Sequence, residues 1–184
     1  MMLTAIDHDG PAALRYPRGS GFGVDISAPP KKLEIGKGEI LRSGTDVAIV
    51  GLGSMVQPAV EAAEMLKSNG IDATVVNARF IKPLDKELIL SLVGEHRLIV
   101  TVEEAYLAGG FGSAVMELLE ERGMLDRVKV VRMGVPDEIV PHGDPKKLLA
   151  GYGLDAAGIE RKVIESLATL GERKPEKQRL RVVR

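Results

Sequence analysis

The stretch DVAIVGLGSMVQPAVEAAEMLKSNG, residues 46–70, decides the fold of this chain. Residues 47–50 are a short apolar run, which predicts a buried strand, and the glycines of residues 51–54 then turn the chain. Apolar side chains recur at helical spacing over residues 56–66 until the stop signal Asn69-Gly70. The stretch is therefore predicted to be a strand followed by an amphipathic helix.

The same rhythm of apolar run, turn and helix repeats downstream. Residues 73–76 predict a second strand, followed by a turn and a helix that starts at Asp85. Residues 98–102 predict a third strand, which a glycine-rich turn connects to a helix ending at Gly123. A further strand is predicted at residues 128–131, and closing helices at residues 146–149 and 156–170. This alternation predicts an α/β three-layer sandwich, in which helices cover both faces of a mostly parallel sheet of about five strands.

Both ends of the chain lack this rhythm. Residues 1–32 are dense in Gly and Pro, and we interpret them as the tail end of an upstream domain plus a linker. Residues 33–41 are predicted to form a strand pair, interrupted at Gly36 and Gly38, at the edge of the main domain, which spans residues 33–170. Residues 171–184 hold six Lys or Arg against two Glu, and we expect this basic tail to be disordered.

Composition narrows the classes of protein to which the chain can belong. Its 184 residues suffice for one α/β core, and a net charge of -1 gives no reason to expect nucleic acid or a membrane as partner. The absence of cysteine excludes disulfides and thiolate zinc sites. The first ten residues do not resemble a secretory signal, and no stretch approaches the ~20 apolar residues of a membrane span. We therefore expect a soluble, cytoplasmic chain.

The glycines of residues 51–54 occupy the place of a dinucleotide-binding loop, between a strand and a helix. The third glycine of that fingerprint would fall at Val56, so the sequence favours a tight turn, and nucleotide binding stays a third hypothesis. Ser54 with Gln57 three residues later is typical of a capping box at the start of the helix.

Acidic residues and histidines supply few candidates for chemistry. Glu103 and Glu104 follow the third strand at the sheet edge where sites usually form, but neighbouring strand residues face opposite ways, so they are not an acid/base pair. The histidines, His8, His96 and His142, have no second ligand at metal spacing, so no metal site is predicted. His96 is expected to be a solvated turn residue. His142 lies in a Pro-flanked loop and is the best placed of the three for a polar contact.

The arginines are the better candidates for a binding site. Arg15 and Arg18 flank a proline, and Arg79 follows the second predicted strand at the same sheet edge. A guanidinium group is a planar fork of donors that matches phosphate oxygens. Spacing alone nevertheless favours solvated surface arginines.

Several motifs occur together in a recognisable order. They are RYPRG at residues 15–19, VVNARFIKPLD at 75–85, VTVEE at 100–104, GGFGS at 109–113, MGVPDEIVPHGD at 133–144 and GLDAAGI at 153–159. In order and spacing they resemble the C-terminal part of the 1-deoxy-D-xylulose-5-phosphate synthases, which belong to the transketolase superfamily. The resemblance covers roughly residues 10–170.

This resemblance implies a part of a thiamine-diphosphate-dependent transferase. The family condenses pyruvate with D-glyceraldehyde 3-phosphate, releases carbon dioxide, and makes 1-deoxy-D-xylulose 5-phosphate for isoprenoid and thiamine biosynthesis. Two upstream domains of the family hold the thiamine diphosphate and Mg²⁺, and the sequence contains neither of them. The resemblance therefore implies a homodimer when full-length, and a fragment that has no cofactor, no catalytic residue and no activity alone.

The resemblance also assigns roles to residues. By motif match, Arg15 and Arg79 clamp the phosphate of the acceptor sugar, while Arg18 is structural. Glu103, Glu104 and His142 are further candidates at the edge of the site. The alternative hypothesis is a stand-alone C-terminal subunit, or an interaction module, that docks onto separately encoded partners of a split thiamine-diphosphate enzyme.

Overall fold

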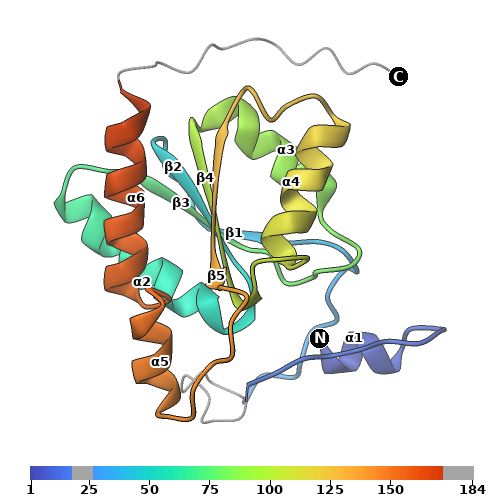
Figure 1. Ribbon diagram of the computed structural model, residues 1–184. Coiled ribbons are helices and arrows are strands. Elements are labelled where there is room, and N and C mark those ends of the chain that lie inside the picture. The colour runs from blue at the N-terminus through green and yellow to red at the C-terminus, as the bar shows by residue number, and fades with distance from the viewer. Residues whose placement is uncertain (18–26, 172–184) are drawn as a thin grey trace.

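The computed structural model describes residues 1–17 and 27–171, and within them one mostly parallel sheet forms the centre of the protein (Figure 1). Its five strands are β1 (Glu39–Arg42), β2 (Val47–Gly51), β3 (Ala73–Asn77), β4 (Leu98–Tyr106) and β5 (Lys129–Val135). Their order is β1-β3-β2-β4-β5, and only β1 is antiparallel to its neighbour. The prediction for Arg18 and, beyond Gly171, the prediction of a disordered tail lie outside the described residues.

Helices cover both faces of the sheet, as the alternating pattern predicted. The helices are α1 (Met2–Ile6), α2 (Val56–Ser68), α3 (Lys86–Glu95), α4 (Phe111–Glu121), α5 (Pro145–Gly151) and α6 (Ala156–Leu170), with a short 3₁₀ helix η1 (Gly53–Met55) before α2. Figure 1 shows α2 and α6 on one face and α3 and α4 on the other. The three-layer sandwich is therefore confirmed.

Two apolar cores lie on either side of the sheet because its central strands alternate. Along β2, Val47 and Ile49 pack with α2 and α6, while Ala48 and Val50 pack with α3 and α4. All four side chains have no exposed surface, which is why this strand is a continuous apolar run. The burial on both faces is the main source of stability for the fold.

The edge of the sheet near residues 33–41 differs from the prediction. Instead of a strand pair, a single strand, β1, begins at Glu39, and a turn precedes it at Gly36, whose φ is 75°. The backbone N–H of Gly38 donates to Asp85 Oδ2 over 2.9 Å, so this segment is tied to the start of α3. No strand pair forms because the chain turns at residues 34–37, where the N–H of Lys37 donates to the carbonyl oxygen of Glu34 over 3.3 Å.

The N-terminal segment carries the short helix α1, which the sequence pattern did not indicate. A hydrogen bond connects α1 to the segment that leads into the sheet: the hydroxyl of Thr4 accepts from the backbone N–H of Leu33 over 2.8 Å. Figure 1 shows α1 at the end of the molecule where the parallel strands end.

The prediction that His96 is solvated is wrong. Only 1% of its surface is exposed, and its Nε2 lies 2.9 Å from Thr74 Oγ1 and 3.1 Å from the carbonyl oxygen of Gly44. Nδ1 lies 3.1 Å from the carbonyl oxygen of Leu92. His96 follows α3 directly and fills the gap between this helix and the strands, so it joins three segments that are distant in the sequence.

Replacing His96 by alanine should therefore destabilise the protein by about 2–4 kcal/mol, because the change leaves a cavity and unpaired buried polar groups. Urea unfolding followed by circular dichroism measures this change. The matched control is His142→Ala at an exposed position, which should stay within about 0.5 kcal/mol of the parent. Equal stabilities for the two variants would contradict the assigned role of His96.

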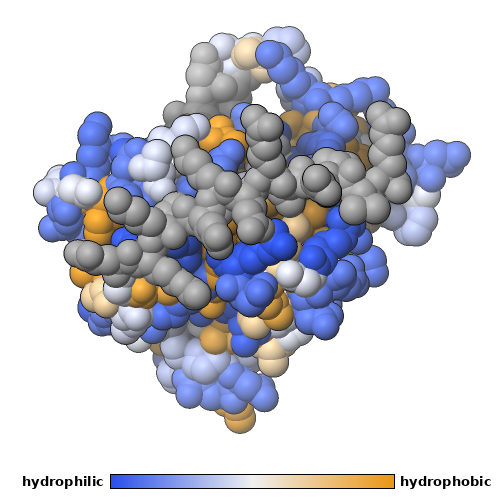
Figure 2. Space-filling model, turned by 90° about the horizontal axis from the view of Figure 1, so that it is seen from above, coloured by the Kyte–Doolittle hydropathy of each residue, from blue (hydrophilic) through white to orange (hydrophobic). Residues whose placement is uncertain are grey.

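The outer surface is mixed in polarity. Figure 2 shows the end of the molecule where the parallel strands begin, on which hydrophilic side chains surround scattered hydrophobic ones. Among the described residues, none of the helices has the length and apolar character needed to cross a membrane.

Candidate functional site

The candidate site lies at the carboxyl edge of the sheet, where β2, β3 and β4 end. In open α/β sheets, ligands bind at this edge because the loops that follow the strands converge there. The N-terminal segment reaches the same edge, since Arg15 Nη2 donates to the carbonyl oxygen of Glu104 over 2.8 Å. The structure thus brings Arg15 to β4, although 89 positions separate it from Glu104 in the chain.

Glu103 is a structural residue of this edge. Its side chain is 1% exposed, and its two carboxylate oxygens accept hydrogen bonds from the backbone N–H groups of Phe111 at 2.7 Å and Gly112 at 2.8 Å. These N–H groups have no partner within helix α4 because they belong to its first turn. A Cβ atom on Gly110 would lie 2.4 Å from Glu103 Oε2. A glycine is therefore needed at position 110 because the Glu103 carboxylate packs closely against the backbone there.

Removing this carboxylate should loosen the start of α4. We expect Glu103→Ala to lower the free energy of unfolding by about 2–4 kcal/mol because two buried N–H groups lose their acceptor. Glu103→Gln keeps one good acceptor oxygen and should cost about half as much. Chemical denaturation checks this order, with the exposed Glu117→Gln on the same helix as a control expected within about 0.5 kcal/mol. A Glu103→Ala variant as stable as this control would refute the capping role.

Glu104 faces the opposite side of β4, as the alternation of strand residues predicts. Its Oε2 accepts a hydrogen bond of 2.5 Å from Ser54 Oγ, in the turn between β2 and α2. The capping box predicted for Ser54 and Gln57 is therefore wrong: Ser54 lies inside η1, and the Gln57 side chain donates to Glu61. The strand β4 runs on to Tyr106, four residues beyond the predicted end at Val102. Glu104 is therefore part of β4, and its carboxylate binds the Ser54 hydroxyl that was expected to cap the helix.

Arg79 follows the end of β3 and has a backbone conformation that residues other than glycine rarely adopt. Its φ is 56°, and its backbone N–H donates to Asn77 Oδ1 over 3.1 Å. The guanidinium group pairs with Glu39 on the neighbouring edge strand β1. Such a left-handed residue costs about 1 kcal/mol or more, and it persists only where the surroundings hold it. Here the Asn77 bond and the Glu39 pair do so.

The structure does not bring the two predicted arginines into contact. Arg15 bonds to β4 and Arg79 follows β3, and β2 lies between these strands. Two strand spacings amount to about 10 Å. Arg79 also turns toward β1, away from β2. Among the described residues, Glu39 is the partner that the sequence analysis missed, and its only signal was the strand pattern of residues 39–42.

His142 lies in the loop between β5 and α5, exposed to solvent. The loop is held at its end by Asp144, whose side chain caps α5 by accepting from the N–H groups of Lys146 and Lys147. Near the start of the loop, the Tyr152 hydroxyl donates a hydrogen bond to Glu138 Oε1 over 2.8 Å. This bond raises the pKa of the Tyr152 phenol. Nearby Ile139 is 96% exposed, which is unusual for a large apolar side chain.

A metal site is not supported in the part of the chain that the structure describes. No group of three or more His, Asp or Glu side chains gathers there at a spacing that could hold a metal ion. The turn at residues 51–54 is tight, as predicted, because a Cβ on Gly51 would lie 3.0 Å from the Cα of Val56.

The fold and the motifs define a class of protein. The family described as "Transketolase, C-terminal domain" matches residues 36–159, and the chain belongs to this family. Comparison with curated proteins narrows the class further. The chain is 56% identical over 163 residues to 1-deoxy-D-xylulose-5-phosphate synthase 1 of Geobacter metallireducens. It is 53% identical over 161 residues to the 1-deoxy-D-xylulose-5-phosphate synthase of Heliobacterium modesticaldum. These matches cover 89% and 88% of the chain, but only 26% and 25% of the relatives. The resemblance inferred from the motifs is confirmed.

Solved structures agree with the fold. A structure titled as an inactive β4 tetramer of a split-gene transketolase is 38% identical and has a TM-score of 0.70, over 79% of this chain and 46% of that one. A transketolase from Pichia stipitis, 21% identical, has a TM-score of 0.56 over 74% of this chain and 18% of that one, which shows the shared fold alone.

Proposed function

We propose that the chain is the C-terminal domain of a 1-deoxy-D-xylulose-5-phosphate synthase and is inactive by itself. The observation that carries this proposal is identity of 50–56% to curated proteins of that name, of which the chain spans only about a quarter. The whole enzyme would condense pyruvate with D-glyceraldehyde 3-phosphate and release carbon dioxide. The alternative of a separately encoded subunit is not favoured, because these relatives are about four times as long as the matched segment.

We further propose that this domain does not itself hold thiamine diphosphate or Mg²⁺, since the two carboxylates at the end of β4 are already engaged. Such a site needs free carboxylate or carbonyl oxygens around the metal, whereas both oxygens of Glu103 accept backbone N–H groups and Glu104 holds Ser54. We therefore assign the cofactor and metal to other domains of the full-length enzyme. The same proposal includes a cytoplasmic homodimer as the active form.

The role proposed for this domain is to bind the phosphate of the acceptor. Arg79 supports this role because it is held at the carboxyl edge in a constrained conformation, and among residues 1–17 and 27–171 it pairs with a single carboxylate, Glu39. Arg15 reaches the same edge and donates to a neutral carbonyl, so its charge is uncompensated within that contact. A phosphate group between β3 and β4 would draw the two side chains toward β2 and replace Glu39 as the partner of Arg79.

A chimera tests the proposal. Residues 10–170 of this chain, which include Arg15 and the whole of α6, replace the matching segment in the Geobacter metallireducens synthase. Product formation from pyruvate and D-glyceraldehyde 3-phosphate is measured with thiamine diphosphate and Mg²⁺. We expect the chimera to retain activity within about tenfold of the parent, because the two chains are 56% identical over the matched residues. A folded, dimeric chimera without activity would count against the proposal.

A further inference from the structure

The strand β5 lies at the edge of the sheet that the structure describes, so one side of its backbone has no strand partner there. In the described part of the chain β5 pairs with β4 alone. The N–H of Lys129 donates to the carbonyl of Arg97 and the carbonyl of Val135 accepts from Leu107, so odd-numbered residues of β5 face β4. The backbone groups of Val130 and Arg132, both half-buried, consequently point outward, where they can pair with another strand. Gly134 has the same orientation but is buried.

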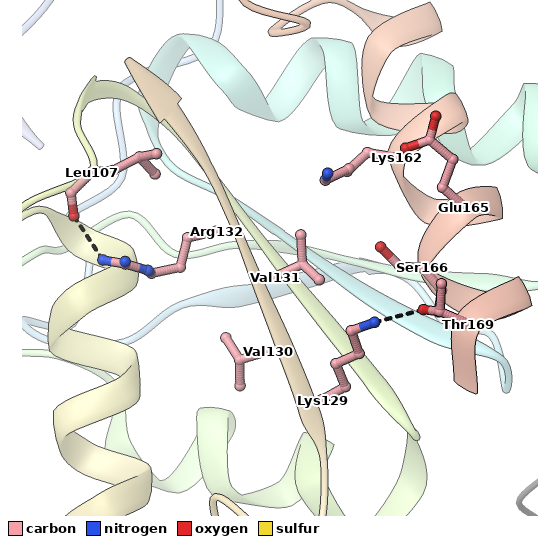
Figure 3. Close-up of a pocket in the computed structure, with 9 residues that line it drawn as sticks. All are labelled: Leu107, Lys129, Val130, Val131, Arg132, Lys162, Glu165, Ser166 and Thr169. Atoms are coloured by element: carbon pink, nitrogen blue, oxygen red, sulfur yellow. Dashed lines mark hydrogen bonds between the residues drawn. The ribbon is translucent and has the colours of Figure 1, made fainter. Parts of the chain in front are cut away.

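A groove follows this outer edge. One hollow of about 480 Å³ lies between β5 and α6, and a second of about 290 Å³ continues toward the turn between α5 and α6. Arg132, Lys162 and Glu165 line both hollows, so they form one continuous groove. Figure 3 shows side chains of α6 on one side of β5 and Arg132 with Leu107 on the other. The groove thus runs beside the outward-facing backbone of β5.

The groove is strongly basic. Lys129, Arg132, Arg161 and Lys162 line it together with a single acidic side chain, Glu165. Within residues 1–17 and 27–171 none of these cations is in an ion pair. Lys129 donates to Thr169 Oγ1 at 2.7 Å, and Arg132 donates to the Leu107 carbonyl and Ser113 Oγ at 2.8 Å, all of which are neutral acceptors. The cations are therefore positioned without being neutralised.

We propose that the outer edge of β5 binds an extended, acidic segment of a partner protein, which adds a sixth strand to the sheet. Main-chain hydrogen bonds to Val130 and Arg132 would supply the pairing, and carboxylates of the segment would meet the cations of the groove. A second copy of this chain is disfavoured, because pairing β5 with itself would bring two basic grooves next to each other. This binding function is additional to the phosphate-binding role proposed above.

The test uses the 184-residue chain labelled with ¹⁵N and the acetylated peptide EVEVEVE as probe. Two further probes separate charge from backbone pairing: KVKVKVK, and the acidic peptide with every backbone amide N-methylated. We expect only EVEVEVE to bind, and we expect it to slow amide exchange at Val130 and Arg132 by about tenfold or more, as new hydrogen bonds require. The amides of Lys129 and Val131 already face β4 and should change little.

Two variants probe the surface independently. Val130→Pro removes an outward N–H without touching the ladder to β4 and should abolish binding of the peptide. Lys129→Glu with Lys162→Glu should weaken binding about tenfold or more through charge alone, whereas Lys86→Glu on the opposite face should not. The proposal is overturned if the N-methylated or the basic peptide binds equally well, if the charge variants bind like the parent, or if the chain alone forms dimers with protected Val130 and Arg132 amides.

Discussion

Gly158→Ala should be among the most destabilising single substitutions in this domain, by about 3 kcal/mol or more. A Cβ at this position would lie 2.3 Å from the carbonyl oxygen of Gly153 and 2.5 Å from its Cα, both backbone atoms of the turn that joins α5 to α6. The turn cannot retreat freely, because Asp155 caps α6 through the N–H of Gly158 at 2.8 Å and Gly153 has a φ of 71°. Overpacking of this kind costs 1–3 kcal/mol or more.

Thermal unfolding measures the effect, as a fall in melting temperature of roughly 6–12 °C for a chain of this size. The matched control is Gly151→Ala in α5, where a Cβ would meet nothing within 4 Å. Alanine is the better helix former, so the control should be neutral or stabilising by up to about 1 kcal/mol. If Gly158→Ala melted with the control, the close approach of α6 to Gly153 would be wrong.

Arg79→Ala in the active chimera should reduce kcat/KM for D-glyceraldehyde 3-phosphate by about 30-fold or more, which corresponds to about 2 kcal/mol. The reason is that the acceptor phosphate would lose one of its two guanidinium partners. Arg79→Lys should recover only part of the loss, because lysine keeps the charge but not the planar fork. Pyruvate carries no phosphate, so its KM should change little.

The control for Arg79 is Lys82→Ala, which removes an exposed cation from the same turn and should leave kcat/KM within about twofold. Glu39→Gln provides a test in the other direction. It removes the carboxylate that holds Arg79, so it should lower the KM for the phosphorylated acceptor if phosphate and Glu39 compete for the same guanidinium group. Unchanged kinetics in Arg79→Ala would take this residue out of the site.

Much of the fold was predictable because burial on both faces of a parallel strand leaves a strong signal. The runs at residues 47–50 and 98–102 predicted β2 and the start of β4, and Asp85 was correctly expected to begin α3, since its side chain accepts from the Leu88 N–H. These signals are local. They depend on the apolar period and on caps within one element, so no tertiary information is needed to read them.

The errors concern polar residues whose partners are distant in the sequence. His96 looks like a turn residue until Thr74 and Gly44 are placed around it, 22 and 52 positions away. The local sequence around Ser54 is typical of a helix cap, but its hydroxyl donates instead to Glu104 on β4, 50 positions away. A pattern over a few residues carries no record of such contacts. For the same reason, the family resemblance pointed to the two arginines but could not show that Glu39 pairs with one of them.

The most direct test of the central claim compares the 184-residue chain with the chimera that contains its residues 10–170. Both are supplied with pyruvate, D-glyceraldehyde 3-phosphate, thiamine diphosphate and Mg²⁺, and carbon dioxide release is followed together with product formation. We expect product from the chimera and none from the isolated chain. Product made by the isolated chain, or a folded chimera that makes none, would contradict the account of this domain as a phosphate-binding part of a larger synthase.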